Sequence, residues 1–258
     1  MRFARVLFLG DSVTWGGERI DQADTYPELF EERYGKWCSR PVEALNASAG
    51  SWGIGNLRAY AERFGFFGSD LVVLQIGERD LTQPMSDSTG IGSLCTSPRS
   101  APVLAVQEAF KCFGPRLLNR LKKWMSWNEA GQNQEKTPST STEAVDEQEK
   151  RQFEKNMEHL QALITDIRAS EKPIAVLYNP LREHVGPNGG EPPPWYGKFR
   201  SRLDRQNVPM IDLQSMWKNK EGANKYYRDY IHPNQRGNVA LAKVISRFFR
   251  DEYPQICR

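Results

Sequence analysis

Histidine and cysteine are scarce in this chain of 258 residues, which has three histidines and four cysteines. The cysteines, Cys38, Cys95, Cys112 and Cys257, form no C-x-x-C pair and have no histidine cluster beside them that would complete a zinc site. We therefore expect no bound metal. A chain of this length buries enough apolar surface to fold without a disulfide framework, so we expect all four cysteines to be reduced thiols.

Long apolar stretches are also missing, since no run of 18 or more apolar residues exists to cross a bilayer. The chain begins with a basic residue and an apolar run, Val6–Leu9. This run is too short for the hydrophobic part of a secretion signal, and no small-residue cleavage site follows it. These absences predict a cytoplasmic protein without a membrane span.

Charge of one sign is not in excess, because 35 Lys and Arg against 32 Asp and Glu leave a net charge of +3. This balance does not favour nucleic acid or acidic lipid as a partner. With 39% hydrophobic and 26% charged residues, the composition is that of a folded globule. The length suits one α/β domain with an insertion, and no feature of the sequence indicates an oligomeric state.

Short apolar runs separated by helical patterns make up most of the chain. Runs without polar alternation are typical of strands that are covered on both faces. They occur at residues 6–9, 42–45, 71–76, 174–178 and 208–213. Apolar residues repeat every three or four positions over residues 153–167 and 241–248, which predicts helices. Strands that alternate with helices predict a parallel five-stranded sheet in a three-layer α/β/α sandwich.

This alternation is interrupted at about residues 84–152, which we interpret as an insertion within one domain that spans the chain. Residues 84–102 are rich in Ser, Thr, Gly and Pro and predict a long loop. Residues 103–127 predict a broken helix. Its basic stretch, residues 111–127, either touches a membrane or polyanion or, as we favour, is a solvated helix that packs over the rim of a ligand-binding cleft. Residues 131–150 contain a single aliphatic residue larger than alanine, which predicts a mobile segment.

A serine follows the first expected strand, in the sequence Gly10-Asp11-Ser12. Ligands of open parallel sheets bind beyond the carboxyl ends of the strands, where a nucleophile would be useful. Ser12 would equally serve as the N-cap of a following helix, and its position alone favours that structural role.

A base for Ser12 is available near the other end of the chain, at His232. A serine hydroxyl is a poor nucleophile until a base removes its proton, and imidazole does so near neutral pH. Asp229 precedes His232 by three residues, so its carboxylate can reach Nδ1 and leave Nε2 for the serine. His184, which follows an expected strand, is a weaker candidate for a residue that lines the same cleft.

The two segments Gly10-Asp11-Ser12 and Asp229-x-x-His232-Pro-Asn together resemble the SGNH/GDSL hydrolase family, and the resemblance extends from about residue 7 to residue 250. It implies a flavodoxin-like sheet and an enzyme without a cofactor, in which a Ser-His-Asp triad of Ser12, His232 and Asp229 cleaves acyl esters through an acyl-enzyme. The implied substrate is a small-molecule, saccharide or lipid ester, and the sequence does not choose among these.

Two further segments resemble the parts of this family that stabilise the oxyanion. Residues 46–53 are similar to the segment whose glycine donates a backbone N–H, and either Gly50 or Ser51 can take that place. The family's Gly-x-Asn-Asp corresponds to Gly77-Glu78-Arg79-Asp80, so Arg79 stands where the family has the asparagine whose amide holds the oxyanion.

Three interpretations of Arg79 follow. Its guanidinium donates a charge-assisted hydrogen bond to the oxyanion, or it binds an anionic group on the substrate. Alternatively, it pairs with Glu78, Asp80 or Asp11 and leaves the oxyanion one donor short. Because the loss of one such donor costs about 3–4 kcal/mol of transition-state stabilisation, the last interpretation predicts a weak esterase.

Two other functions are compatible with these residues. The same acyl-enzyme would make the protein an acyltransferase if another alcohol took the place of water. A binding or scaffold protein would keep the fold while Arg79 weakened catalysis. The retention of Ser12, Asp229 and His232 together argues against the scaffold, which would not need them.

Overall fold

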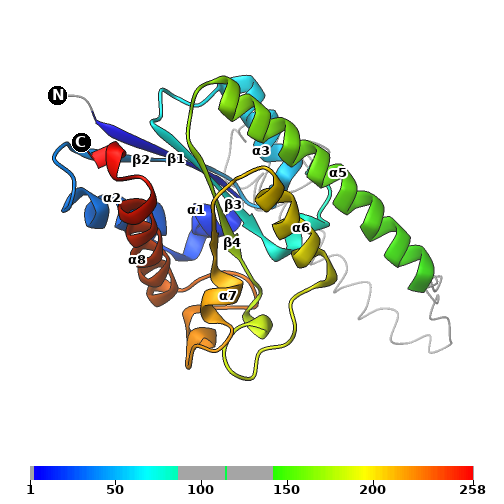
Figure 1. The fold of residues 1–258 in the computed structure, drawn as a ribbon. Coiled ribbons are helices and arrows are strands. Elements are labelled where there is room, and N and C mark those ends of the chain that lie inside the picture. The colour runs from blue at the N-terminus through cyan, green and yellow to red at the C-terminus, as the bar shows by residue number, and fades with distance from the viewer. Residues whose placement is uncertain (1–2, 87–113, 115–141, 258) are drawn as a thin grey trace. The chain divides into compact units, whose positions relative to one another are not determined.

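The computed structural model describes residues 3–86, 114 and 142–257 (Figure 1). Contacts divide the chain into one unit of residues 1–86 and 146–258 and another of residues 87–145. The first unit holds the sheet and every predicted site residue. Apart from residue 114, the broken helix expected at residues 103–127 lies outside the described residues, as does most of the loop expected at residues 84–102.

Within the described residues, five strands form one parallel sheet in the order β2-β1-β3-β4-β5. The strands are β1 (Ala4–Gly10), β2 (Val42–Ser48), β3 (Leu71–Gly77), β4 (Ile174–Asn179) and β5 (Met210–Asp212). In register, Gly10 lies opposite Ser48 and Gly77 opposite Asn179. The last residues of these four strands therefore form one edge of the sheet. Strand β5 is shorter than the predicted 208–213 segment.

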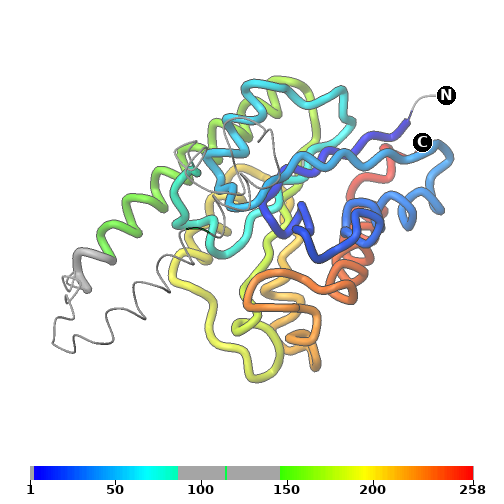
Figure 2. The backbone as a smooth tube through the Cα atoms, turned by 180° about the vertical axis from the view of Figure 1, so that it is seen from behind, coloured from blue at the N-terminus to red at the C-terminus, as the bar shows by residue number. Residues whose placement is uncertain are grey.

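Helices cover both faces of the sheet, which confirms the predicted three-layer α/β/α sandwich (Figures 1 and 2). One face carries α2 (Tyr26–Gly35), α7 (Leu213–Trp217) and α8 (Gln235–Glu252). The other carries α3 (Ile54–Phe64), α5 (Thr142–Ala169) and α6 (Pro194–Arg205). A short helix, α1 (Ser12–Trp15), follows β1 directly.

Alternate residues of β1 serve opposite cores, which explains its continuous apolar run. Val6 and Phe8 belong to the core beneath α2 and α8, whereas Leu7 and Leu9 belong to the core beneath α3 and α5. The Phe8 ring meets Phe30 of α2 edge to face, with centroids 5.3 Å apart. Both faces of the strand are therefore apolar, as expected of the interior of a covered parallel sheet.

Helix α5 begins at Thr142, so the last part of the 131–150 segment, which we expected to be mobile, is helical. Glu147 forms ion pairs with Lys150 and Arg151 at 3.5 and 3.9 Å, one turn of helix away. Such pairs and the high helix propensity of Glu, Gln, Lys and Ala extend a helix into solvent without a buried face. No helix in the described part of the chain has the length and apolar composition that crossing a membrane requires.

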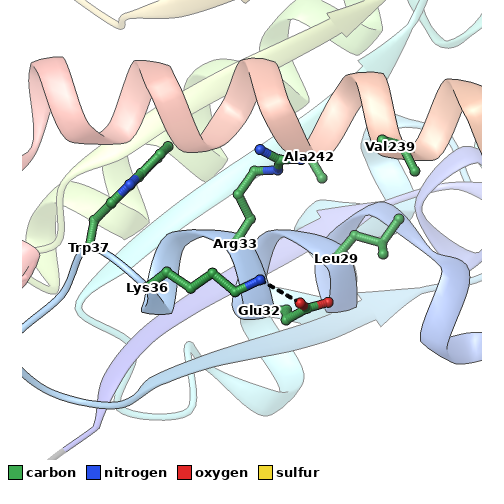
Figure 3. Close-up of a pocket in the computed structure, with 7 residues that line it drawn as sticks. All are labelled: Leu29, Glu32, Arg33, Lys36, Trp37, Val239 and Ala242. Atoms are coloured by element: carbon green, nitrogen blue, oxygen red, sulfur yellow. Dashed lines mark hydrogen bonds and ion pairs between the residues drawn. The ribbon is translucent and has the colours of Figure 1, made fainter.

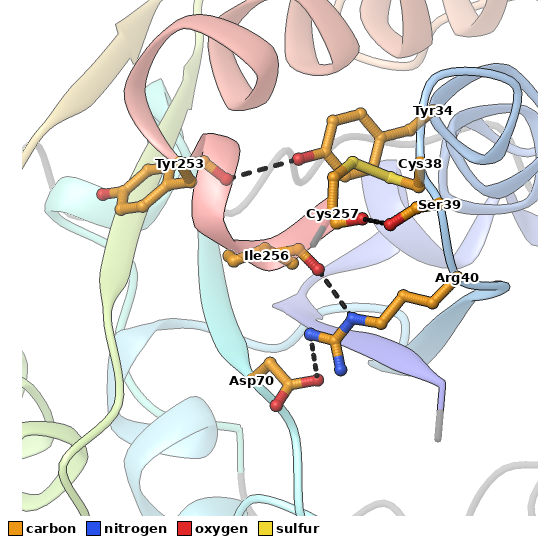
Figure 4. The surroundings of a disulfide bond; sticks show 8 residues. All are labelled: Tyr34, Cys38, Ser39, Arg40, Asp70, Tyr253, Ile256 and Cys257. Atoms are coloured by element: carbon orange, nitrogen blue, oxygen red, sulfur yellow. Dashed lines mark hydrogen bonds and ion pairs between the residues drawn. A yellow bond between two sulfur atoms is a disulfide. The ribbon is translucent and has the colours of Figure 1, made fainter. Parts of the chain in front are cut away.

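A disulfide joins Cys38 to Cys257, so the prediction of four reduced thiols is wrong for this pair (Figure 4). The two Cα atoms lie 4.4 Å apart across 219 residues of sequence. Ser39 donates to the Cys257 carbonyl through its N–H at 3.0 Å and its hydroxyl at 2.7 Å. Arg40 donates to the carbonyl of Ile256 at 2.9 Å. The pairing depends on how the C-terminal turn packs against the chain after α2. The other two cysteines lie outside the described residues.

Candidate active site

Ser12 is the first residue of α1, at the edge where β1 ends. The N-cap of this helix is Asp11 rather than Ser12, and the Asp11 carboxylate accepts the N–H of Val13 at 2.7 Å. The Ser12 hydroxyl is thus free of the capping role that its position alone suggested. Its Oγ lies 2.9 Å from Nε2 of His232.

His232 and Asp229 occupy the loop before α8. Asp229 Oδ2 lies 2.9 Å and Oδ1 3.1 Å from Nδ1 of His232. Oδ1 also accepts the backbone N–H groups of Ile231 at 3.0 Å and His232 at 2.8 Å. With a carboxylate on the Nδ1 side, the ring carries its proton there and Nε2 is left to accept the proton of Ser12. The structure therefore brings together the three residues that the sequence predicted to act together.

The carboxylate of Asp229 stays charged because of these contacts. Partial burial alone would raise its pKa, but the two backbone N–H donors and the His232 ring outweigh burial and lower the pKa to about 2. Arg228 lies 3.5 Å from the same carboxylate. A permanent negative charge beside Nδ1 stabilises the imidazolium that forms when His232 takes a proton.

Two buried carboxyl groups lie under this site. Burial raises the pKa of Asp11 to about 6 against the opposing influence of its hydrogen bonds and of His232. Burial, and the nearby Asp11, also raise the pKa of Asp80 well above its usual value. Asp80 Oδ2 accepts the N–H of Gly77 at 2.7 Å, and Asp11 Oδ1 accepts the N–H of Val13 at 2.7 Å. Both carboxyl groups therefore bind backbone N–H groups near the strand ends.

Gly50 and Ser51 lie in the turn after β2. Ser51 has a φ of 62°, and a Cβ added to Gly50 would lie 3.4 Å from the Trp15 ring, which follows Ser12 closely in the chain. Within the described part of the chain, neither the Gly50 nor the Ser51 N–H donates a hydrogen bond. Trp52 packs against Tyr60 with centroids 5.3 Å apart. Two backbone donors thus remain available beside Trp15, the last residue of α1.

Arg79 lies just beyond the end of β3, and its exposed side chain reaches Tyr230. Its guanidinium donates to the Tyr230 hydroxyl at 2.8 Å and lies 5.7 Å from the centroid of the tyrosine ring. Among the described residues it forms no ion pair with Glu78, Asp80 or Asp11, the partners that the sequence suggested. Sequence reasoning missed Tyr230, although its place between Asp229 and His232 was a usable signal.

Glu78 instead pairs with His184. Its Oε2 lies 2.7 Å from His184 Nδ1 and accepts the N–H of Leu181 at 3.1 Å. The His184 side chain is thereby bound to a buried acid at the end of β3 rather than to Ser12. This pair ties the loop after β4 to the segment that carries Arg79.

A cavity of about 820 Å³ borders the loop that carries Asp229 and Tyr230, and its other walls come from residues 182–188 and 221–224. A smaller cavity of about 320 Å³ lies between α2 and α8 and contains no predicted site residue (Figure 3). There, Lys36 bonds Glu32 at 2.7 Å on the rim, while Trp37 lines one end. In the described ranges, no group of three His, Cys, Asp or Glu residues is arranged to hold a metal ion.

The structure is a three-layer α/β sandwich in which a serine, a histidine and an aspartate are in contact at the carboxyl edge of the sheet. This arrangement is typical of α/β hydrolases. The sequence profile of the GDSL-like lipase/acylhydrolase family matches residues 8–240, and the chain belongs to that family. Its relationship to a family of hydrolases confirms the resemblance that the two motifs indicated.

Comparison with solved structures finds the same fold at low sequence identity. The acetyl xylan esterase AlAXEase is 18% identical with a TM-score of 0.57, over 95% of this chain and 98% of the other. A lipase/acylhydrolase from Enterococcus faecalis is 15% identical with a TM-score of 0.54, over 96% of each chain. TesA is 14% identical with a TM-score of 0.53, over 96% and 98%. None of the curated proteins compared with the chain matches it.

Proposed function

We propose that this chain is a serine esterase that hydrolyses acyl esters through Ser12, His232 and Asp229. The observation that carries the proposal is the 2.9 Å contact between Ser12 Oγ and His232 Nε2, two atoms that belong to residues 220 positions apart. A hydroxyl at this distance from an unprotonated imidazole nitrogen is within reach for proton transfer. Membership of an acylhydrolase family supports the same chemistry.

In the proposed mechanism, His232 removes the Ser12 proton while Oγ attacks the ester carbonyl. The tetrahedral intermediate collapses when His232 gives that proton to the leaving alcohol, and an acyl-enzyme remains. Water then attacks the acyl carbonyl with His232 as base, and Ser12 is restored when the acid departs. Asp229 keeps the ring orientation constant through both steps.

The developing oxyanion needs donors that are fixed in advance. We assign this role to the backbone N–H groups of Ser12 and of the Gly50–Ser51 turn, because the latter have no other acceptor in the described part of the chain. Arg79, the third residue predicted to contact the oxyanion or substrate, is held toward Tyr230.

The substrate we propose is an acyl ester of a sugar or a lipid, with an O-acetyl group among the candidates. Because one of the similar structures is an acetyl xylan esterase, an acetylated sugar is the first substrate to assay. Most of the insertion expected at residues 84–152 lies outside the described residues.

The cytoplasmic location stays a prediction. The Cys38–Cys257 disulfide does not favour it, because disulfides are rare in reducing compartments. Cell fractionation of the native chain would test the location directly.

Covalent labelling with a fluorophosphonate tests the nucleophile. We expect the native protein to be labelled and Ser12→Ala and His232→Ala to be labelled far more slowly. Ser201→Ala, which removes an exposed hydroxyl on α6, is the matched control and should label like the native protein. Absence of labelling in the native protein would contradict the esterase and favour the scaffold.

Product analysis then separates hydrolysis from acyl transfer. With a synthetic acetyl ester and an added sugar acceptor, a hydrolase releases acetate irrespective of the acceptor. Acetylated sugar as the main product would make the protein a transferase with the same acyl-enzyme.

A further inference from the structure

The arginine that replaces the family asparagine is oriented without being neutralised. Arg79 has one hydrogen-bond partner among the described residues, the uncharged hydroxyl of Tyr230, 2.8 Å away. The tyrosine side chain is 56% exposed, and the arginine side chain is exposed as well. A guanidinium has five N–H donors, so most of them face toward possible ligands rather than toward protein.

The two acidic residues next to Arg79 in the sequence bind other groups. Glu78 binds His184 and the Leu181 N–H, and it is 8% exposed. Asp80 accepts the Gly77 N–H and is 3% exposed. The fold has therefore turned both neighbouring carboxyl groups inward and left the positive charge at the surface.

Asp229, in the loop that carries Tyr230, also binds other groups. Asp229 contacts His232 and Arg228, and its oxygens also accept two backbone N–H groups. The charge of Arg79 is thus not cancelled by an ion pair in the described part of the chain. A surface cation that is held in place by a neutral partner is a favourable site for a ligand anion.

We propose that Arg79, positioned by Tyr230, binds a carboxylate of the substrate, so that the enzyme prefers esters that carry an acidic group near the scissile bond. This inference rests on the proposed esterase function and names the class of substrate. It assigns Tyr230 as a positioning residue and Arg79 as a substrate-binding residue.

The backbone around Tyr230 fixes the guanidinium relative to the triad. Tyr230 lies between Asp229 and His232, and its carbonyl accepts the N–H of Arg182 at 2.9 Å. The Arg228 N–H donates to the His232 carbonyl at 2.9 Å, which closes the loop on itself. A carboxylate bound by Arg79 therefore lies beside the loop that carries the imidazole. This is the condition under which binding energy orients a reacting ester.

Pairs of esters in which an uncharged group replaces a carboxylate test the proposal. On the acyl side, mono-p-nitrophenyl glutarate is compared with p-nitrophenyl pentanoate. On the alcohol side, 3-acetoxybenzoate is compared with its methyl ester. For each pair, the ratio of kcat/KM for the acidic ester to that for the neutral ester measures the preference, and the pair with the larger ratio shows which side carries the carboxylate.

We expect the native enzyme to prefer the acidic member of at least one pair by about tenfold, as one charge-assisted hydrogen bond provides. Arg79→Gln should reduce that ratio to about one, mainly through KM. Arg79→Lys should keep part of it, because the charge remains and the planar fork is lost. Tyr230→Phe, which keeps the ring and removes the acceptor, should lower the ratio severalfold.

Arg63→Gln is the matched control. Arg63 also lies over an exposed aromatic ring, that of Phe64 at 5.2 Å, but it is at the end of α3. Removing its charge should leave the ratio unchanged. Added salt should lower the native preference and have no effect on the ratio of Arg79→Gln.

With an enzyme that turns over, two results would overturn the proposal. One is a native enzyme that hydrolyses the neutral esters through Ser12 with no preference for the acidic ones. The other is an Arg79→Gln enzyme that loses activity equally on both members of each pair, which is the behaviour of an oxyanion donor. Failure of the esterase function is distinguished by titrating Ser12→Ala with 3-acetoxybenzoate. Binding that depends on Arg79 supports the anion site without turnover, and the absence of such binding refutes it.

Discussion

The hydroxyl of Ser12 and the imidazole of His232 meet at 2.9 Å although 220 residues separate them. The contact exists because β1 delivers Ser12 to the carboxyl edge of the sheet and the loop before α8 returns to the same edge. Asp229 needs no such long-range arrangement, since it bonds His232 within a single turn of chain. The proposed proton transfer therefore depends on the position of this loop relative to the end of β1.

Replacing Asp229 tests the role of its charge. Asp229→Asn keeps an oxygen for the N–H groups of Ile231 and His232 but removes the negative charge beside Nδ1 and allows the wrong tautomer. We expect kcat on a p-nitrophenyl ester to fall by about 10⁴, and the thermal midpoint to fall as well, because the charged carboxylate stabilises the fold above its usual pKa of 3.8. Asp251→Asn, at an exposed position of α8, should leave kcat at the native value. An active Asp229→Asn enzyme would show that the carboxylate does not orient the base.

The buried Asp11 should make stability depend on pH. Its pKa in the folded state is about 6, above the usual 3.8, so between these values the folded chain binds a proton that the unfolded chain has released. Its contribution is therefore most favourable below about pH 4 and is lost as the pH rises through about 6. The pKa of Asp229, lowered to about 2, stabilises the fold above its usual value of 3.8 and hardly changes over this range.

Asp11→Asn isolates that effect, because the amide oxygen can still cap the Val13 N–H. We expect the variant to be more stable than the native chain at pH 7.5, by about 2 kcal/mol, and the two to converge toward pH 4.5. Urea unfolding at both pH values measures the difference. A constant difference between the two proteins would mean that Asp11 does not titrate in this range.

Glycine at position 10 is required by a close approach. A Cβ there would lie 2.0 Å from Thr14 Oγ1 and 2.7 Å from Gln75 Oε1, both of which are buried. Gly10→Ala should therefore destabilise the protein by about 1–3 kcal/mol and disturb the start of α1, with loss of activity. Gly197→Ala is the matched control on α6, where a Cβ meets nothing within 4 Å. It should raise stability by about 0.5–1 kcal/mol.

The disulfide should contribute to stability and not to chemistry. Cys38→Ser is expected to lower the free energy of unfolding by about 2–4 kcal/mol while kcat at 25 °C stays native, because the bond is remote from the triad. Dithiothreitol should lower the stability of the native protein to that of the variant and have no further effect on Cys38→Ser. Equal stability of the oxidised and reduced native protein would show that the bond does not constrain the unfolded chain.

The success of sequence reasoning differed between local and distant features. The apolar runs predicted the parallel sheet because strands that are buried on both faces are made almost entirely of apolar residues. The three-residue spacing of Asp229 and His232 predicted their contact because a short turn brings such residues together. The prediction for Arg79 left several partners open, since the end of a long side chain can reach many atoms around its Cα.

Other features could not be predicted from the sequence for a similar reason. The polar composition of residues 131–150 predicted a mobile segment and did not indicate the start of α5 at Thr142, where charged side chains one turn apart form ion pairs. Nothing in the sequence around Cys38 or Cys257 predicts that they pair, because the two cysteines meet only when the C-terminal turn packs beside the chain after α2.

The amino-acid sequence by itself determined the layered α/β architecture, the hydrolase family and the identity of the three residues proposed to react. The architecture follows from the periodicity of apolar residues, the three reacting residues from their chemistry and spacing, and the family from the resemblance of two motifs to those of known hydrolases. Only the tertiary structure decided that Arg79 meets Tyr230, that Glu78 meets His184 and that Cys38 meets Cys257. Each of these pairs joins separate loops, and the packing of a whole chain, rather than any local pattern, sets the distance between loops.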